Sequence, residues 1–185
     1  MGICGICTRE FMPDKPKQIV CGVDCALIAG RALNKAEIEK ERKKQDKIKK
    51  IQSQPITHFK KLAQTDFNAY IRVRDQHKSC VSCHKPPHRG QRHASHYRPR
   101  STAAQLSFNT GNVWASCATC NSVLSGNLTN YRRELVERIG ESRVIDLENN
   151  NNIASFSREY LIRLRQVFIK KRKHLIKLRA VIGEY

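Results

Sequence analysis

The eight cysteines of this 185-residue chain fall into four close pairs, and this pairing constrains the fold more than any other feature. A C-x2-C pair places two thiolates on one tight turn, and two such pairs complete a closed tetrahedral zinc site. The later two pairs are separated by 33 residues. We therefore predict a structural Zn²⁺ site formed by Cys80, Cys83, Cys117 and Cys120.

The earlier two pairs predict a second zinc module at the start of the chain. A C-x2-C pair is followed, after thirteen residues, by a C-x3-C pair. A redox-active C-x2-C pair is the alternative, but no βαβ pattern surrounds it. Zinc modules of this size contact DNA or protein, and the sequence leaves both partners open. The predicted ligands are Cys4, Cys7, Cys21 and Cys25.

Charge and composition favour a polyanionic partner. Thirty-five Lys and Arg residues against sixteen Asp and Glu residues give a net charge of +19, for which nucleic acid is the first candidate. An acidic membrane surface is the alternative, but no apolar amphipathic anchor accompanies the charge. Hydrophobic residues make up 39% of the chain, so we expect small zinc-supported cores. We expect neither a signal peptide nor a membrane span, and the cysteine usage favours a reducing compartment.

The helical pattern divides into segments with different roles. Residues 29–51 are strong helix formers with few apolar positions, which predicts an exposed basic helix in a linker. It is either a solvated spacer or an arm that follows DNA phosphates, with Lys43 and Lys44 as candidate contacts. Residues 57–77 repeat apolar positions at helical spacing, so one face of that helix should be buried.

The last predicted helix, residues 157–182, combines an apolar 3-4 repeat with a second basic surface. Two copies could pair through the repeat as a homodimer, or the repeat could pack on the chain's own helices. Shorter helices are expected at 128–139 and 141–147. The basic candidates for DNA binding are Lys170, Lys171, Arg172 and Lys173.

The segment between the later cysteine pairs contains the candidate catalytic residues. We expect strands at 91–97 and 112–116 and a helix opening near Asn121. His96 is a candidate general base, because neutral imidazole can take a proton from water near neutral pH. Asn112 could brace the loop that joins the strands. His93 and Asn121 could hold a catalytic Mg²⁺ or Mn²⁺, and an imidazole ligand leaves Mn²⁺ open because Mg²⁺ prefers oxygen.

The histidines and Arg98 of this segment have competing interpretations. Residues three apart on a flat strand point to opposite faces, so His93 and His96 can share a site only if the strand bends. Arg98 is either a clamp for the scissile phosphate or an exposed basic side chain. His84 and His88 are rival zinc ligands by spacing, although four cysteines already close the site.

Several motifs together resemble a known family. They are the His-Tyr-Arg run at 96–98, residues 105–109, the C-x2-C-Asn run at 117–121 and residues 125–128. The order of histidine, asparagine and metal ligand resembles the HNH, or ββα-metal, nucleases, and more closely the phage resolvase endonuclease VII. A still closer resemblance is to the phage NinG (Rap) recombination family, over roughly residues 57–180. Relatives tend to place an acidic metal ligand shortly before the base histidine, where this chain has His93.

The resemblance implies an α+β, mainly helical fold with a small zinc-stabilised ββα-metal nuclease core and long basic helices. The expected division is a zinc module at 1–28, a linker at 29–56, an HNH-like domain at 57–147 and a basic helix at 148–185. The implied activity is metal-assisted cleavage of branched DNA, such as Holliday junctions, in the host bacterial cytoplasm, with recombination proteins as further partners. A non-catalytic, zinc-dependent DNA-binding accessory protein and a non-specific HNH nuclease are the alternatives.

Overall fold

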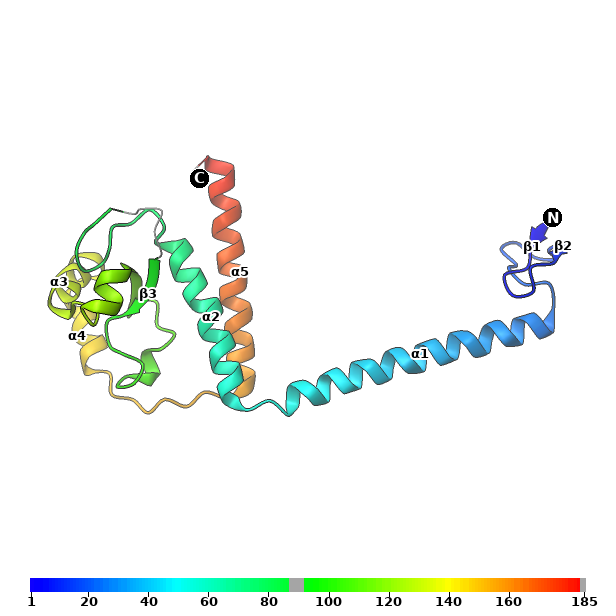
Figure 1. The fold of residues 1–185 in the computed structure, drawn as a ribbon, viewed down its shortest axis with the longest axis horizontal. Helices are drawn as coiled ribbons and strands as arrows, with labels where there is room; N and C mark the ends of the chain where they lie inside the picture. The colour runs from blue at the N-terminus through cyan, green and yellow to red at the C-terminus, as the bar shows by residue number, and fades with distance from the viewer. Residues whose placement is uncertain (87–91, 184–185) are drawn as a thin grey trace. The chain divides into compact units, whose positions relative to one another are not determined.

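The computed structural model describes residues 1–86 and 92–183, and the chain divides into two compact units. The first unit is Met1–Gln54 and the second is Pro55–Tyr185. Figure 1 shows that helices dominate both units and that the strands are short, so the predicted α+β, mainly helical class is confirmed. No helix in the described ranges is long and apolar enough to cross a membrane.

The first unit joins a cysteine cluster to a long helix. Strands β1 (Gly2–Ile3) and β2 (Glu10–Phe11) pair antiparallel around the first cysteine pair. Helix α1 (Val23–Gln52) starts earlier than predicted, because Cys25 lies in its first turns and belongs to both the cluster and the helix. The rest of α1 is almost entirely exposed, and its ion pairs, such as Arg42 with Glu39 at 2.9 Å, contribute little in open solvent.

Two helices packed side by side frame the second unit (Figure 1). These are α2 (Ile56–Arg74) and α5 (Arg158–Ile182), and Ser157 caps α5 by accepting a hydrogen bond from the Tyr160 amide. The Phe67 and Phe168 rings meet edge to face with centroids 4.8 Å apart. The apolar repeat of α5 thus packs on the chain's own helix at Leu161, Leu164 and Phe168.

A β-hairpin lies between α2 and the shorter helices. Strands β3 (Arg92–His96) and β4 (Val113–Cys117) pair antiparallel, with His96 opposite Val113. The 3-10 turn η1 (Ala104–Leu106) lies in the connection between them. Val113 packs into the cluster formed with α2 and α5, whereas Trp114 packs with α3 and α4, so alternate residues of β4 bury on opposite faces.

The chain leaves β4 through a π-helical turn, η2 (Thr119–Val123), which stands where a helix was expected to open. Helices α3 (Leu128–Ile139) and α4 (Glu141–Asn149) follow, close to their predicted bounds. Gly140 separates them with φ at +88°, a left-handed backbone value that favours glycine. Tyr131 of α3 is fully buried and donates a hydrogen bond to the Ser95 carbonyl, which fixes α3 to the hairpin.

A buried ion pair fastens the end of α2 to β4. Arg74 binds both carboxylate oxygens of the fully buried Asp75, at 2.8 and 2.7 Å. The same carboxylate accepts a hydrogen bond from the Ala115 amide at 3.0 Å. The Arg74 guanidinium also lies 4.1 Å from the Trp114 ring centroid. Because each charge is paired and hydrogen-bonded, this contact holds α2 at a defined place beside the hairpin.

Candidate functional site

The four later cysteines come together as predicted and could hold a zinc ion. Their sulfur atoms all lie within 4.8 Å of one another, and Cys83 Sγ is 3.8 Å from Cys117 Sγ. Four sulfurs bound at about 2.3 Å to a tetrahedral ion lie about 3.8 Å apart, so the cluster fits Zn²⁺ without rearrangement. All four are free thiols, and three of the four are buried.

Backbone amides donate hydrogen bonds to two of the sulfurs in this cluster. The Cys117 amide donates a hydrogen bond to Cys80 Sγ at 3.3 Å, and the Cys120 amide donates to Cys117 Sγ at 3.4 Å. Burial acts to raise the pKa of Cys80, but the surrounding backbone amides outweigh it and lower that pKa to about 7. A sulfur that is easily deprotonated is a better metal ligand, so the local backbone supports the zinc assignment.

The four N-terminal cysteines form a second cluster that could hold zinc. Their sulfurs also lie within 4.8 Å, with Cys7 Sγ 3.5 Å from Cys21 Sγ and Cys21 Sγ 3.7 Å from Cys25 Sγ. Backbone amides of Cys7 and Ile6 lower the pKa of the Cys4 thiol to about 6. These distances match the tetrahedral spacing as well as those of the later cluster do.

His96 and Asn121, which the sequence predicted to act together, line one cavity of about 280 Å³. His96 comes from the end of β3 and Asn121 from η2. The cavity also receives Asn68 of α2, so three separate elements meet there. The remaining lining residues are Ala94, Ser95, Pro99, Arg100, Ser125 and Gly126.

The environment of His96 suits a general base. Its Nε2 lies 3.1 Å from the carbonyl oxygen of Ser107. A carbonyl only accepts hydrogen bonds, so Nε2 carries the proton and Nδ1 remains to accept one. Burial, together with the positive charge of Arg100, lowers the pKa of His96 below its ordinary 6.5, against the opposing effect of the Ser107 carbonyl. The imidazole is therefore neutral at physiological pH.

Asn112 braces the loop between the strands, in the place that the sequence suggested. It is fully buried just before β4. Its Oδ1 accepts a hydrogen bond from the Arg98 amide at 2.9 Å, and its Nδ2 donates to the carbonyls of Arg98 and Leu106 at 3.1 and 3.3 Å. The side chain thus closes the loop that follows His96 and orients it without touching the cavity.

The four-cysteine cluster positions Asn121, because Asn121 directly follows Cys120. The loop beyond it is tied back twice. The Gly126 amide donates to the Cys120 carbonyl at 2.8 Å, and the Ser82 hydroxyl donates to the Gly126 carbonyl at 2.9 Å. Both cysteine pairs of the cluster are therefore linked to the rim of the cavity.

Two predicted site residues lie elsewhere. His93 is paired opposite Ser116 and does not line the cavity, since β3 remains regular and residues three apart face opposite sides. Arg98 does not reach the cavity either. Its guanidinium donates to the carbonyls of Leu147, Glu148 and Asn150 at 2.8, 2.9 and 2.6 Å, which ties β3 to the end of α4. Arg98 is a structural residue here, and its phosphate-clamp interpretation is corrected.

Of the two histidines that rivalled the cysteines as zinc ligands, the structure describes His84. His84 Nδ1 lies 3.1 Å from a carboxylate oxygen of Glu134 and belongs to neither cluster. His88 lies outside the described residues.

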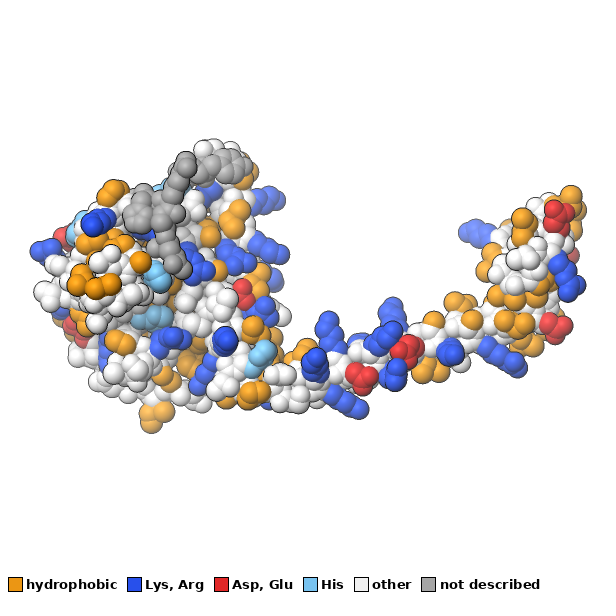
Figure 2. All heavy atoms as spheres, viewed as in Figure 1, with side chains coloured by type: hydrophobic (Ala, Val, Ile, Leu, Met, Phe, Trp, Pro, Cys, Tyr) orange, Lys and Arg blue, Asp and Glu red, His pale blue; other side chains and the backbone are white. Residues whose placement is uncertain are grey.

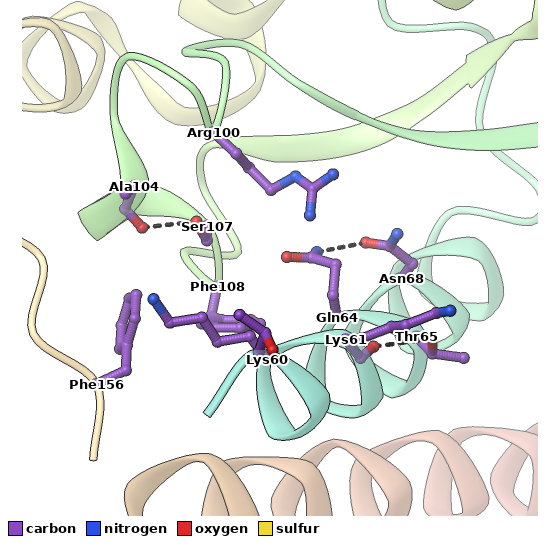
Figure 3. Close-up of a pocket in the computed structure, with 11 residues that line it drawn as sticks. Lys60, Lys61, Gln64, Thr65, Asn68, Arg100, Ala104, Ser107, Phe108 and Phe156 are labelled. Atoms are coloured by element: carbon purple, nitrogen blue, oxygen red, sulfur yellow. Dashed lines mark hydrogen bonds between the residues drawn. The ribbon is translucent and has the colours of Figure 1, made fainter. Parts of the chain in front are cut away.

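Arg100, and not Arg98, is the arginine that lies beside His96, where the sequence analysis expected a phosphate clamp. It lines the His96 cavity and also a larger neighbouring groove of about 550 Å³. Figure 3 shows its side chain extending toward Gln64 and Asn68 of α2. Two signals could have found it: it follows Pro99, where the chain turns after the strand, and it is the next arginine after Arg98.

The cavity does not contain a ready-made acidic metal site. Within the described ranges, the groups of His, Cys, Asp and Glu that could hold a metal are the two cysteine clusters. The amide side chains of Asn121 and Asn68 line the cavity, but no carboxylate among the described residues does. Such a donor set has the oxygen ligands that Mg²⁺ and Mn²⁺ accept, but it lacks negative charge, which a bound phosphate would have to add.

The predicted basic surfaces are exposed, as DNA contacts require. Figure 2 shows Lys and Arg side chains along α1 and over the second unit. Lys43 and Lys44 form exposed ion pairs within α1, at 3.5 and 3.4 Å from glutamates. On α5, Lys171 Nζ lies 5.7 Å from the Phe168 ring centroid. The exposed or half-exposed basic residues of α5 in this stretch are Lys170, Lys171, Arg172 and Lys173.

Comparisons with known proteins give a consistent result. The family model described as Bacteriophage Lambda NinG protein matches residues 2–178. The chain is 36% identical over 183 residues to Protein ninG of Escherichia phage lambda, covering 91% of this chain and 89% of the relative. It is 35% identical to Protein ninG of Salmonella phage P22, with 91% and 90% covered. No solved structure matches the chain.

Proposed function

We propose that this chain, which belongs to the bacteriophage lambda NinG protein family, is a structure-specific endonuclease that hydrolyses phosphodiesters in branched DNA such as Holliday junctions. The observation that carries the proposal is the shared cavity of His96 and Asn121, built next to a four-cysteine cluster. The order of a histidine on the first strand, an asparagine bracing the second and a ligand after it supports an HNH-like assignment. The proposed place of action is the cytoplasm of the host bacterium.

His96 acts as the general base in this proposal. Its Nε2–H is held by the Ser107 carbonyl, so Nδ1 can take a proton from a water molecule that attacks phosphorus. The lowered pKa keeps the imidazole neutral and ready to accept that proton. Arg100 lies on the same cavity and can bind a non-bridging phosphate oxygen, which would fix the phosphate against the base.

Asn121 is the proposed ligand for a divalent cation that arrives together with the DNA. When bound, Mg²⁺ or Mn²⁺ would stabilise the charge that develops on the phosphate and the leaving oxygen. His93 does not line the cavity, so the proposal gives it no role in this site. In this proposal Asn121 orients the cation and neutral His96 deprotonates the water. The DNA phosphate contributes the negative charge that the cavity lacks.

A preference for branched DNA would come from separate basic surfaces that touch different duplex arms. Phosphate contacts carry no sequence code, so contacts to several arms at once would select a branched shape and not a sequence. The α1 surface is represented by Lys43 and Lys44, and the α5 surface by residues 170–173. The N-terminal cysteine module would contact DNA or a recombination protein.

The experiment that tests the activity uses synthetic four-way, three-way and linear DNA with a series of divalent cations. Wild type should nick the branched substrates with Mg²⁺ or Mn²⁺. His96→Ala should bind the four-way junction with unchanged affinity and lower cleavage by about 10²-fold or more, as expected for loss of a general base. His93→Ala is the matched control and should cleave like wild type.

The cavity also favours a second candidate function. No carboxylate in the described part of the chain lines it, which suits a non-catalytic, zinc-dependent DNA-binding protein that assists recombination. That candidate is correct if wild type binds the junction but never nicks it with any cation in the series. A third outcome, equal cleavage of linear and branched DNA, would identify a non-specific nuclease.

A further inference from the structure

A groove beside the His96 cavity has the chemistry of a nucleobase site. We call it the α2 groove, and it has a volume of about 550 Å³, within the range of small-ligand sites. It adjoins the His96 cavity, because Asn68 and Arg100 line both. The other residues lining the α2 groove are Thr57, Lys60, Lys61, Gln64, Thr65, Ala104, Ser107, Phe108 and Phe156.

Two aromatic rings line this groove. Phe108 and Phe156 meet edge to face with centroids 5.4 Å apart, and both side chains are only partly buried. Phe156 also stacks on Tyr160 at 5.7 Å with an interplanar angle of 16°. Lys60 Nζ lies over the Phe156 ring, 5.7 Å from its centroid, at one end of the groove (Figure 3), and an incoming base would have to displace this flexible side chain. Partly exposed rings of this kind are the surfaces on which unpaired bases stack.

The polar groups of the groove complement a base edge and a phosphate. Gln64 Nε2 donates to Asn68 Oδ1 at 2.8 Å. Either orientation of these two amides leaves one acceptor oxygen and one NH₂ group for a ligand. Lys60, Lys61 and Arg100 form no ion pair with a carboxylate in the described part of the chain, and no acidic residue there lines the groove. Cations without acidic neighbours, next to hydrogen-bonding amides, favour a nucleotide over an apolar ligand.

We propose that the α2 groove holds one unstacked nucleobase of the strand whose phosphate lies at His96. This inference rests on the proposed function, because it deepens the substrate class of the same site. Bases inside a continuous duplex are stacked and cannot enter such a groove, whereas bases at a branch point cost less to unstack. The groove would therefore select branch points directly, in addition to any selection by the basic helices.

The test measures binding without cleavage, on the full chain in the absence of divalent cations. Phe156→Leu keeps apolar volume but removes the ring, and Phe156→Tyr keeps the ring. Phe156→Leu should raise the Kd for a four-way junction about 5- to 150-fold, the loss of one base–aromatic stack, and leave the Kd for linear duplex unchanged. Phe156→Tyr should bind both DNAs like wild type.

A second set of junctions locates the base. Each carries an abasic site at one position around the branch. At one position wild type should lose affinity, and there Phe156→Leu should bind no worse than wild type, because the two changes remove the same interaction. The inference would be overturned if the abasic site weakened Phe156→Leu and wild type equally at every position. It would also be overturned if Phe156→Leu lost the same affinity for linear and branched DNA, because that result would indicate a site for phosphates alone.

These readouts separate the inference from the proposed activity. Junction-selective loss in Phe156→Leu without cleavage by wild type would support the base site and contradict the nuclease. Cleavage by wild type with no binding change in Phe156→Leu would support the nuclease and contradict the base site. Thermal unfolding of both variants confirms that the fold is retained.

Discussion

At the residue scale, the arrangement around His96 shows what a sequence pattern can and cannot locate. The order of His96, Asn112 and Asn121 predicted a shared cavity and a braced loop, because the four-cysteine cluster and a hairpin bring those positions together. The choice between Arg98 and Arg100 could not be made in advance. The two lie two positions apart around Pro99, and only the path of the turn decides which one faces the cavity.

The charge of Arg100 sets an expectation for pH dependence. It is one cause of the lowered pKa of His96, so Arg100→Gln should raise that pKa toward its ordinary 6.5. Protonated imidazole cannot act as a base, and cleavage should fall as the pH drops through the pKa. The acidic limb should therefore move to higher pH in the variant. NMR titration of the His96 ring measures the shift independently of activity.

Lys61→Gln is the matched control for this experiment, because it removes a positive charge from the neighbouring groove without contributing to the pKa of His96. Its His96 titration should overlay that of wild type. An unchanged midpoint in Arg100→Gln would show that burial alone lowers the pKa.

At the element scale, the helices were predicted more accurately than their contacts. Apolar spacing predicted α2 and α5 because buried faces repeat at the helical period. The same spacing could not decide whether α5 pairs with a second chain or with α2, since both partners bury the same stripe. The π-helical form of η2 was also missed, because cysteine spacing predicts a metal turn but not its hydrogen-bond pattern.

Zinc removal should separate the two cysteine clusters. Cys117→Ser should lower the zinc content by one ion per chain and unfold the hairpin, because the cluster joins the start of the hairpin region to the end of β4. Cys7→Ser should also lose one ion but leave the hairpin folded. Atomic absorption gives the zinc content, and the emission of Trp114, the chain's one tryptophan, reports on the second unit alone. Wild-type emission from Cys117→Ser would contradict a structural role for this cluster.

At the scale of the whole molecule, the net charge of +19 is spread over two separate units. Composition alone predicted a polyanionic partner, since a surplus of this size needs no knowledge of the fold. It could not predict that, among the described residues, the cations around the His96 cavity and the α2 groove would be free of acidic neighbours, because the residues lining them come from distant parts of the sequence.

Neutralising the α5 surface should reduce the salt dependence of DNA binding. Changing the four basic residues at 170–173 to Gln should lower the slope of log K against log salt by about 0.9 for each phosphate that the variant no longer neutralises. Titrations of a four-way junction at several salt concentrations measure this slope. The control variant changes four exposed basic residues of the second unit that lie outside α1, α5 and the N-terminal module: Arg72, Lys85, Arg133 and Arg143. Equal slopes in the two variants would show that net charge, and not the α5 surface, drives binding.

The partner of the His96 imidazole is a main-chain oxygen, that of Ser107. No substitution of the side chain at that position deletes it, so the proton on the ring is secured by the path of the polypeptide itself. A mutational scan should accordingly find that small residues at position 107 preserve the proposed cleavage. Changes that displace the adjoining 3-10 turn should abolish it. The function of His96 as a base then depends on the geometry of the loop and not on which side chain stands at position 107.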